Sequence, residues 1–324
     1  MFAAPVRRPP RWVFVFATLL LMLQAGCEQS QPVTTEVQAT ASGTRVLTLG
    51  DIDPDEPATR VRRLQPLADY LARNLRDFDI GRGRVVIARN IEEMAALMES
   101  GEVDLLFDSP FPVLAVNTMS TGRPFLLRHA RGDAEYWSLI VTRKDSGLRT
   151  LPDLNGTVLV FQERHSTSGY LLPASLLSAR GYTLETTPRP DSSVPPDRIG
   201  CYFSGDEENT VELIRSGRAP AGVLSDPDFR ALPAEARDQL RVIERTLSVP
   251  RQLVGVRGDL EDELQAAIGE LLLGLTDDDR KALAAQDAPY GWTWKFDSLS
   301  TATLENLASL EQAIGGLAAC GRSL

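Results

Sequence analysis

Residues 157–170 read TVLVFQERHSTSGY and join an apolar run, Thr157–Phe161, to a hydroxyl-rich cluster, Ser166–Tyr170. A short apolar run that leads into a helix start rich in serine and threonine is typical of a β-strand followed by an α-helix. Unpaired backbone N–H groups meet the positive end of the helix dipole there, so such a turn binds anions without a metal. The alternative is an ordinary helix N-cap. The expected anion-binding residues are Ser166, Thr167, Ser168 and Gly169.

Pro173 predicts where the regular part of this helix begins. Proline inside a helix removes a hydrogen bond and clashes with the preceding turn. We therefore expect a regular helix from about Leu172, with 166–170 as a looser first turn.

The first part of the chain alternates apolar runs with helical patterns. Strand patterns occur at 45–50, 85–88 and 103–107, and amphipathic helix patterns at 60–75 and 91–98. This repetition predicts an α/β fold with mostly parallel sheets flanked by helices. The third strand ends at Asp108 and Ser109, at the carboxyl edge where open α/β sheets bind ligands. An ordinary turn before the helix-starting Pro110 is the alternative.

The later part of the chain predicts a second lobe. Further strand patterns occur at 136–142, 199–203, 221–225, 240–244 and 252–256, helix patterns at 207–215 and 303–317, and a loop at 183–197. The length suits two lobes rather than one small core. We expect lobe 1 to comprise 45–137 and 250–324 and lobe 2 to comprise 138–249. The ligand cleft is expected between them, with hinges near 138–142 and 246–252.

The N-terminus has the pattern of an export signal. Arginines precede an apolar stretch, 12–23, that is too short to span a bilayer, and small residues lead to Cys27. We expect a signal peptide at 1–26, lipidation of Cys27 and a flexible tether at 27–44. The alternative is cleavage without lipidation.

Charge, cysteine and histidine content limit the possible functions. The formal charge of −10 argues against nucleic acid and anionic membrane surfaces as partners. Cys201 and Cys320 either form one disulfide in an exported protein or remain free thiols. With only His129 and His165, neither a metal site nor a cofactor is expected. A hydrolase that uses His165 beside Ser166 is a minor alternative, because no nucleophile-elbow motif surrounds the serine.

Four motifs carry a resemblance to a known family: Gln65–Leu71, Gly101–Leu105, Lys144–Gly147 with Leu151–Gly156, and Ser166–Pro173. In this order and spacing they resemble the substrate-binding proteins of phosphate, phosphite and phosphonate ABC transporters, which are two-lobed periplasmic receptors of the type II class. The resemblance covers about residues 45–275.

The resemblance implies a binding function without catalysis. Such a receptor captures a small oxyanion and delivers it to an ABC permease from the periplasm or cell envelope. The hydroxyl turn at 166–169 then anchors the ligand's oxyanion, and Tyr136 on the crossing strand approaches the ligand. The alternative for Tyr136 is a half-buried strand tyrosine. An alternative for the whole protein is a ligand sensor that signals to a membrane sensor kinase.

Two departures from the family pattern bear on the ligand. Asp108-Ser109-Pro110 stands where relatives often have Gly-Pro, and Ser204-Gly205-Asp206 stands where many have Gly-Ser-His. If Asp108 and Asp206 face the cleft, they repel a dianion unless a proton or a cationic group compensates. An aminoalkylphosphonate-like zwitterion would satisfy both sets of groups. Arg60, Arg62, Arg63 and Arg123 are candidates for positive charge at the rim of the cleft.

Overall fold

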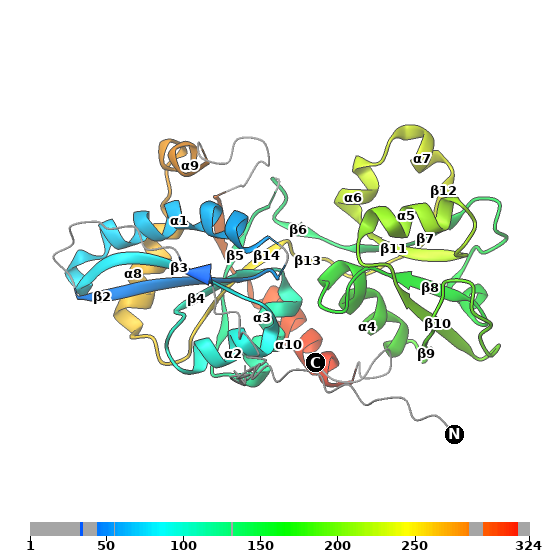
Figure 1. The fold of residues 1–324 in the computed structure, drawn as a ribbon, viewed down its shortest axis with the longest axis horizontal. Coiled ribbons are helices and arrows are strands. Elements are labelled where there is room, and N and C mark those ends of the chain that lie inside the picture. Colours follow the sequence, from blue (N-terminus) through cyan, green and yellow to red (C-terminus); the bar gives the residue numbers. More distant parts are fainter. Residues whose placement is uncertain (1–32, 35–43, 55, 131, 285–293, 317–324) are drawn as a thin grey trace, which may run out of the picture. The chain divides into compact units, whose positions relative to one another are not determined.

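The computed structural model describes residues 33–34, 44–54, 56–130, 132–284 and 294–316 of the 324-residue chain (Figure 1). The predicted signal peptide, Cys27, most of the predicted tether and Cys320 lie outside these residues. None of the helices within the described ranges has the length and apolar character needed to cross a membrane. Cys201 is disulfide-bonded, and the other cysteine of that pair lies outside the described residues.

Seven strands form the first sheet, in the spatial order β1-β3-β2-β4-β14-β5-β15. Strand β2 pairs in parallel with β3 and β4, as the repeated strand and helix patterns predict. Strand β14 returns from late in the sequence and lies antiparallel between β4 and β5. The strand bounds are Val33–Thr34 (β1), Arg45–Ile52 (β2), Ile80–Ala88 (β3), Leu105–Asp108 (β4), Arg123–Arg128 (β5), Gln252–Val256 (β14) and Phe296–Ser298 (β15).

The helices that accompany the first sheet close its core. In α1 the residues Leu64, Leu67 and Leu71 are fully buried, as their helical spacing predicts. Gly83 of β3 lets α1 approach closely, because a Cβ there would lie 2.2 Å from the backbone oxygen of Ala68. The helix bounds are Pro57–Asn74 (α1), Arg76–Phe78 (η1), Ile91–Glu99 (α2), Pro110–Met119 (α3), Asp262–Leu273 (α8), Asp277–Ala284 (α9) and Thr301–Gly316 (α10).

Six strands form the second sheet, in the order β12-β7-β11-β8-β10-β9. Strands β11, β8, β10 and β9 are parallel neighbours, and β7 is antiparallel to both β11 and β12. The strand bounds are Ser138–Arg143 (β7), Val158–Phe161 (β8), Thr183–Thr186 (β9), Arg198–Phe203 (β10), Ala221–Ser225 (β11) and Leu240–Arg245 (β12). The helix bounds are Leu151–Leu154 (η2), Thr167–Leu171 (η3), Leu172–Ala179 (α4), Glu207–Arg215 (α5), Asp226–Ala231 (α6) and Ala234–Asp238 (α7).

Two details of the predicted strands are wrong. The predicted loop 183–197 begins with the edge strand β9, which pairs with β10 and buries Leu184. The predicted strand 136–142 is interrupted at Trp137, whose backbone leaves the strand pairing and exchanges hydrogen bonds with Asp226. Both differences arise from tertiary pairing rather than from local propensity.

Two short strands connect the sheets. Strand β6 (Glu135–Tyr136) pairs antiparallel with β13 (Val249–Pro250), so the chain crosses to the second sheet before β7 and returns before β14. The residues of the predicted first hinge, 138–142, lie in β7 inside the second sheet, and the hinge motion stays a prediction. The strands of the first sheet come from 33–128 and 252–298 and those of the second from 138–245. The lobe boundaries given above stay a prediction.

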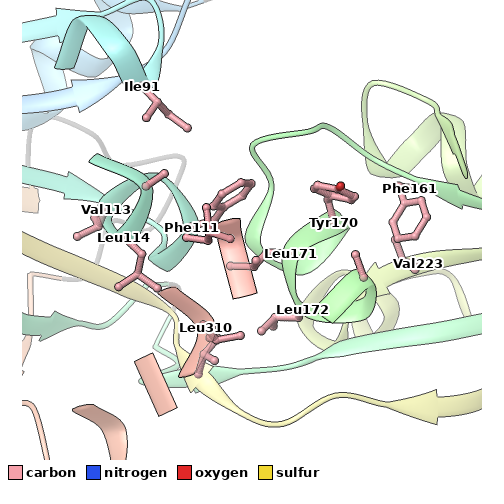
Figure 2. Packing of buried hydrophobic residues seen from close by; sticks show 14 of the residues in the cluster. Ile91, Phe111, Val113, Leu114, Phe161, Tyr170, Leu171, Leu172, Val223 and Leu310 are labelled. Atoms are coloured by element: carbon pink, nitrogen blue, oxygen red, sulfur yellow. The ribbon is translucent and has the colours of Figure 1, made fainter. Parts of the chain in front are cut away.

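A continuous apolar cluster joins helices that follow both sheets. It contains Phe111 of α3, Leu171 of η3, Leu172 of α4 and Leu310 of α10, which lie close together in Figure 2. The starts of α3 and of η3 are therefore neighbours, since both belong to this packed cluster. The segment around Ser166–Tyr170 and the end of β4 are held beside each other by this packing.

Candidate ligand-binding site

A cavity of about 380 Å³ lies where the ends of β2, β4 and β8 meet the crossing segments. Its volume is within the usual range for small-molecule sites. It contains six of the eight predicted site residues. The lining residues are Asp51, Ile52, Asp53, Pro54, Arg60, Asp108, Ser109, Pro112, Tyr136, Gln162, Glu163, His165, Ser166, Thr167, Ser168, Glu207, Asp228, Arg251 and Gln252.

The hydroxyl turn forms a π-helical start that is followed by a regular helix from Leu172, which confirms the prediction made from Pro173. Ser166 is the N-cap, and its Oγ accepts the Gly169 N–H at 2.9 Å. Its carbonyl accepts the next two N–H groups of the turn. The N–H groups of Thr167 and Ser168 have no hydrogen-bond partner among the described residues. Two backbone donors at a helix start are thus available to an anion.

The Thr167 side chain has a different role from its backbone. Thr167 is buried, with 1% of the residue exposed. Its hydroxyl accepts the Phe111 N–H at 2.8 Å and donates to Ser109 Oγ at 3.0 Å. Ser109 is the N-cap of α3, whose first turn begins Pro110-Phe111-Pro112, and the two prolines have no N–H group. The Phe111 N–H is therefore the backbone donor that this turn offers to Thr167. Through its two hydrogen bonds the Thr167 hydroxyl connects the start of α3 to the start of η3.

Gly169 lies behind the cavity surface and is not a lining residue. A Cβ at this position would lie 2.5 Å from Gln162 Oε1 and 2.7 Å from Ser166 Oγ. The glycine therefore leaves space for two cavity side chains. Its functional contribution is to their position rather than to direct contact with the cavity.

Gln162 is a lining residue that the sequence analysis missed. Its side chain is 7% exposed, and its Nε2 has no hydrogen-bond partner among the described residues. A buried donor without a partner costs free energy, so it indicates a site for a ligand acceptor. Its position directly after the strand 157–161, at the carboxyl edge of the sheet, was the available signal.

The crossing segments bring an aromatic ring and a guanidinium to the cavity. Tyr136 lines it and is buried, and burial raises the pKa of its hydroxyl while Arg251 opposes that rise. Arg251 Cζ lies 4.4 Å from the centroid of the Tyr136 ring. Its Nε atom has no hydrogen-bond partner within the part of the chain that the structure describes. Arg251 therefore adds a positive donor to the same cavity.

Carboxylates of the first sheet line the other side. Burial raises the pKa of Asp51 to about 7 and that of Asp108 to about 6, while the Arg60 guanidinium opposes both shifts. Arg60 lies 3.7 Å from Asp51 and 2.7 Å from Asp53, so it supplies the positive charge expected at the rim. Arg62, Arg63 and Arg123 are not lining residues.

The structure does not bring Asp206 to the cavity. Its carboxylate caps α5 by accepting the Asn209 N–H at 2.6 Å. The neighbouring Glu207 lines the cavity instead, together with Asp228. Burial raises the pKa of Glu207, and the nearby carboxylate of Asp228 contributes to the rise. The cavity therefore holds acidic groups on both sides of the donors around Ser166.

Neither a metal site nor a catalytic pair emerges from this geometry. Among residues with assigned positions, no three His, Cys, Asp or Glu side chains are grouped to hold a metal ion. His165 Nε2 lies 3.1 Å from Glu163 Oε2, and the Ser166 hydroxyl serves as the helix cap. The cavity places hydrogen-bond donors around Ser166 beside carboxylates.

The raised pKa values predict a pH dependence of stability. Because the folded state holds protons on Asp51 and Asp108 that the unfolded state releases near pH 4, the unfolding free energy falls as pH rises through about 4 to 7. When the pH is raised from 5 to 8, we expect the unfolding free energy of Asp51→Asn to increase by about 2 kcal/mol relative to that of the wild type. Thermal denaturation of the ligand-free protein across this range measures the difference.

The control for this experiment is Asp77→Asn, which removes an exposed carboxylate that does not line the cavity. Its stability relative to wild type is expected to change little between the two pH values. A constant difference between Asp51→Asn and wild type would show that Asp51 does not retain a proton in the folded state.

Comparison with protein families matches residues 52–298 to the phosphonate periplasmic substrate-binding proteins of ABC transporters. The chain belongs to this family. The family consists of transport binding proteins rather than enzymes and acts in the periplasm with an ABC transporter. The family match thereby confirms the resemblance found in the sequence and the expected transport function. The two sheets and their flanking helices confirm the expected α/β fold class.

Solved structures share this fold. XAC2383 from Xanthomonas citri bound to chloride is 25% identical, with a TM-score of 0.76 over 84% of this chain and 98% of that one. The same protein bound to ATP is 24% identical, also with a TM-score of 0.76, over 85% and 98% of the two chains. PhnD1 from Prochlorococcus marinus in complex with methylphosphonate is 17% identical, with a TM-score of 0.57 over 83% and 98%.

Proposed function

We propose that this family member captures a small phosphonate in the cavity around Ser166 and delivers it chemically unchanged to an ABC permease. One observation carries the proposal: donors from three segments that have no partner among the described residues converge on one cavity. These donors are the N–H groups of Thr167 and Ser168, Nε2 of Gln162 and Nε of Arg251. Together they suit the several oxygens of one oxyanion. The family match favours transport over the sensor-kinase alternative.

We place the anion at these donors and a cationic group of the ligand at the carboxylates. Asp108, Glu207 and Asp228 line the same cavity, and a plain dianion would be repelled by any of them that is ionised. An ammonium group pairs with a carboxylate and removes this repulsion. An aminoalkylphosphonate is therefore the ligand class that satisfies both sides of the cavity. Asp206 has no part in this site, since it caps α5.

Calorimetric titration at pH 8 tests the ligand class, because the carboxyls with pKa values of about 6 and 7 are then largely ionised. We expect 2-aminoethylphosphonate to bind at least about tenfold more tightly than ethylphosphonate, since a charged hydrogen bond contributes ~1.5–3 kcal/mol. Equal affinity of the two would rule out recognition of the ammonium group. The double substitution Ser166→Ala with Ser168→Ala is expected to weaken both ligands.

A thermal-shift screen tests the function itself. The panel comprises phosphate, phosphite, sulfate, alkylphosphonates, aminoalkylphosphonates, organic carboxylates and ATP. A ligand at a hundredfold excess over its dissociation constant stabilises the native state by ~2.7 kcal/mol, which gives a clear shift. No shift with any oxyanion would refute the proposed function.

We propose in addition that Cys27 carries a lipid anchor that holds the protein at the cell envelope. The small residues before Cys27 and the polar segment after it support this proposal.

A further inference from the structure

A second cavity of about 200 Å³ adjoins the ligand cavity, and we call it the annex. Ile52, Pro54 and His165 line both cavities, so the two meet at these side chains. The annex is also lined by residues at the start of α2 and by the residue before His165. These additional residues are Arg89, Asn90, Ile91, Glu92 and Arg164.

Three charged or ionisable residues of the annex, Arg89, Arg164 and His165, have partners of their own, whereas the fourth, Glu92, is exposed. Arg89 forms two hydrogen bonds with Glu93, at 3.0 and 3.2 Å. Arg164 Cζ lies 4.1 Å from the centroid of the Phe203 ring, and His165 pairs with Glu163. Ile52, Pro54 and Ile91 are left as the apolar surface that a ligand would contact.

The combined size of the two cavities exceeds what the smallest phosphonates need. The ligand cavity measures about 380 Å³ before the annex is included. A water molecule accounts for ~30 Å³, so a phosphonate with one carbon would leave most of this space to water. Cavities of several hundred Å³ hold ligands with a larger apolar part. The annex therefore extends the ligand cavity, where the phosphonate and ammonium groups of the ligand are proposed to bind, toward an apolar surface.

We propose that the ligand is an aminoalkylphosphonate with an apolar side chain of several carbons, which occupies the annex. The inference rests on the proposed function, because the phosphonate and amine must first be held in the ligand cavity. Burial of the side chain against Ile52, Pro54 and Ile91 then selects long side chains over short ones.

Titration of the full chain with 1-aminoalkylphosphonates of increasing side-chain length tests the inference. The series runs from aminomethylphosphonate to the phosphonate analogues of alanine, valine, leucine and phenylalanine. We expect affinity to rise about fourfold for each methylene that becomes buried. If aminomethylphosphonate binds and affinity stays flat or falls along the series, the inference is overturned and the proposed function stands. If no member binds but ethylphosphonate does, the inference is overturned and the proposed function stands. If ethylphosphonate also fails to bind, the proposed function itself fails.

Two variants locate the side chain. Glu92→Trp places an aromatic ring from an exposed position of α2 into the annex, and Ile52→Thr makes its wall polar. The ratio compared is the affinity for the leucine analogue divided by the affinity for aminomethylphosphonate. In both variants we expect the two affinities to differ by no more than about threefold. Ile243→Thr, the same change on β12 away from both cavities, is expected to keep the wild-type ratio. A wild-type ratio in both annex variants would show that the side chain binds elsewhere.

Discussion

Gln162→Glu is expected to weaken binding of alkylphosphonates and aminoalkylphosphonates by at least about a hundredfold, with the fold intact. The substitution keeps the shape of the side chain and exchanges its donor for a charged acceptor. In the native protein Nε2 is buried and without a partner among the described residues, beside the free N–H groups of the hydroxyl turn. The oxyanion would therefore lose a donor and face a carboxylate.

The magnitude follows from two contributions. Loss of a hydrogen bond to a charged group costs ~1.5–3 kcal/mol. Repulsion between two charges about 4 Å apart adds ~4 kcal/mol at the effective dielectric constant of a protein surface. Half of this total, ~2.8–3.5 kcal/mol, is enough for the ~2.8 kcal/mol that corresponds to a hundredfold change. Isothermal titration at pH 8 measures the loss directly.

Gln239→Glu is the matched control. It makes the same chemical change and adds the same charge at an exposed position that does not line the cavity. We expect its affinity to stay within about twofold of wild type. If Gln162→Glu also binds phosphonates at nearly wild-type affinity, Gln162 does not contact the anion and the ligand lies elsewhere in the cavity.

Gly83→Ala is expected to destabilise the protein by at least about 3 kcal/mol. A Cβ at Gly83 would lie 2.2 Å from the carbonyl oxygen and 2.3 Å from the carbonyl carbon of Ala68 in α1. Both are backbone atoms, so relief requires α1 to move away from β3. That movement loosens the packing of Leu64, Leu67 and Leu71. Overpacking commonly costs ~1–3 kcal/mol, and a clash with backbone falls at the upper end or beyond.

Thermal denaturation measures this effect, with an expected fall in Tm of roughly 6–12 °C for a protein of this size. Gly269→Ala is the matched control, because its Cβ would lie 3.1 Å from the end of the Phe125 ring. Gly269 is inside α8, where alanine is favoured over glycine by ~1 kcal/mol. We expect a change within about 1 kcal/mol for the control. If both variants were equally stable, α1 and β3 would be able to separate enough for the added methyl group without a loss of unfolding free energy.

Local sequence patterns predicted much of the fold. The helix 207–215 and the strand 221–225 have the predicted bounds in the structure. The irregular start of the helix at 166–171 also follows from Pro173, which acts within one turn of its own position. Such features are determined by residues near one another in the chain, so the sequence contains the complete information for them.

Features that depend on distant partners were not predictable in the same way. Strand β9 exists because β10 lies beside it, and Trp137 leaves the strand pairing because Asp226 offers hydrogen bonds. The family pattern also suggested Asp206 as a cavity residue, because Ser204-Gly205-Asp206 stands where many relatives have Gly-Ser-His. In the structure Asp206 is the N-cap of α5, and the next residue, Glu207, lines the cavity instead.

The sequence by itself determined the α/β fold and the family, because strand periods and ordered motifs are properties of the chain. From the helix start at 166–169 it predicts the place of the anion site. Only the tertiary structure decided which polar atoms remain for a ligand. The Thr167 hydroxyl is engaged by α3, whereas Gln162 Nε2 is buried without a partner among the described residues. Whether a donor is satisfied depends on every atom within hydrogen-bond distance, and those atoms come from segments far apart in the sequence.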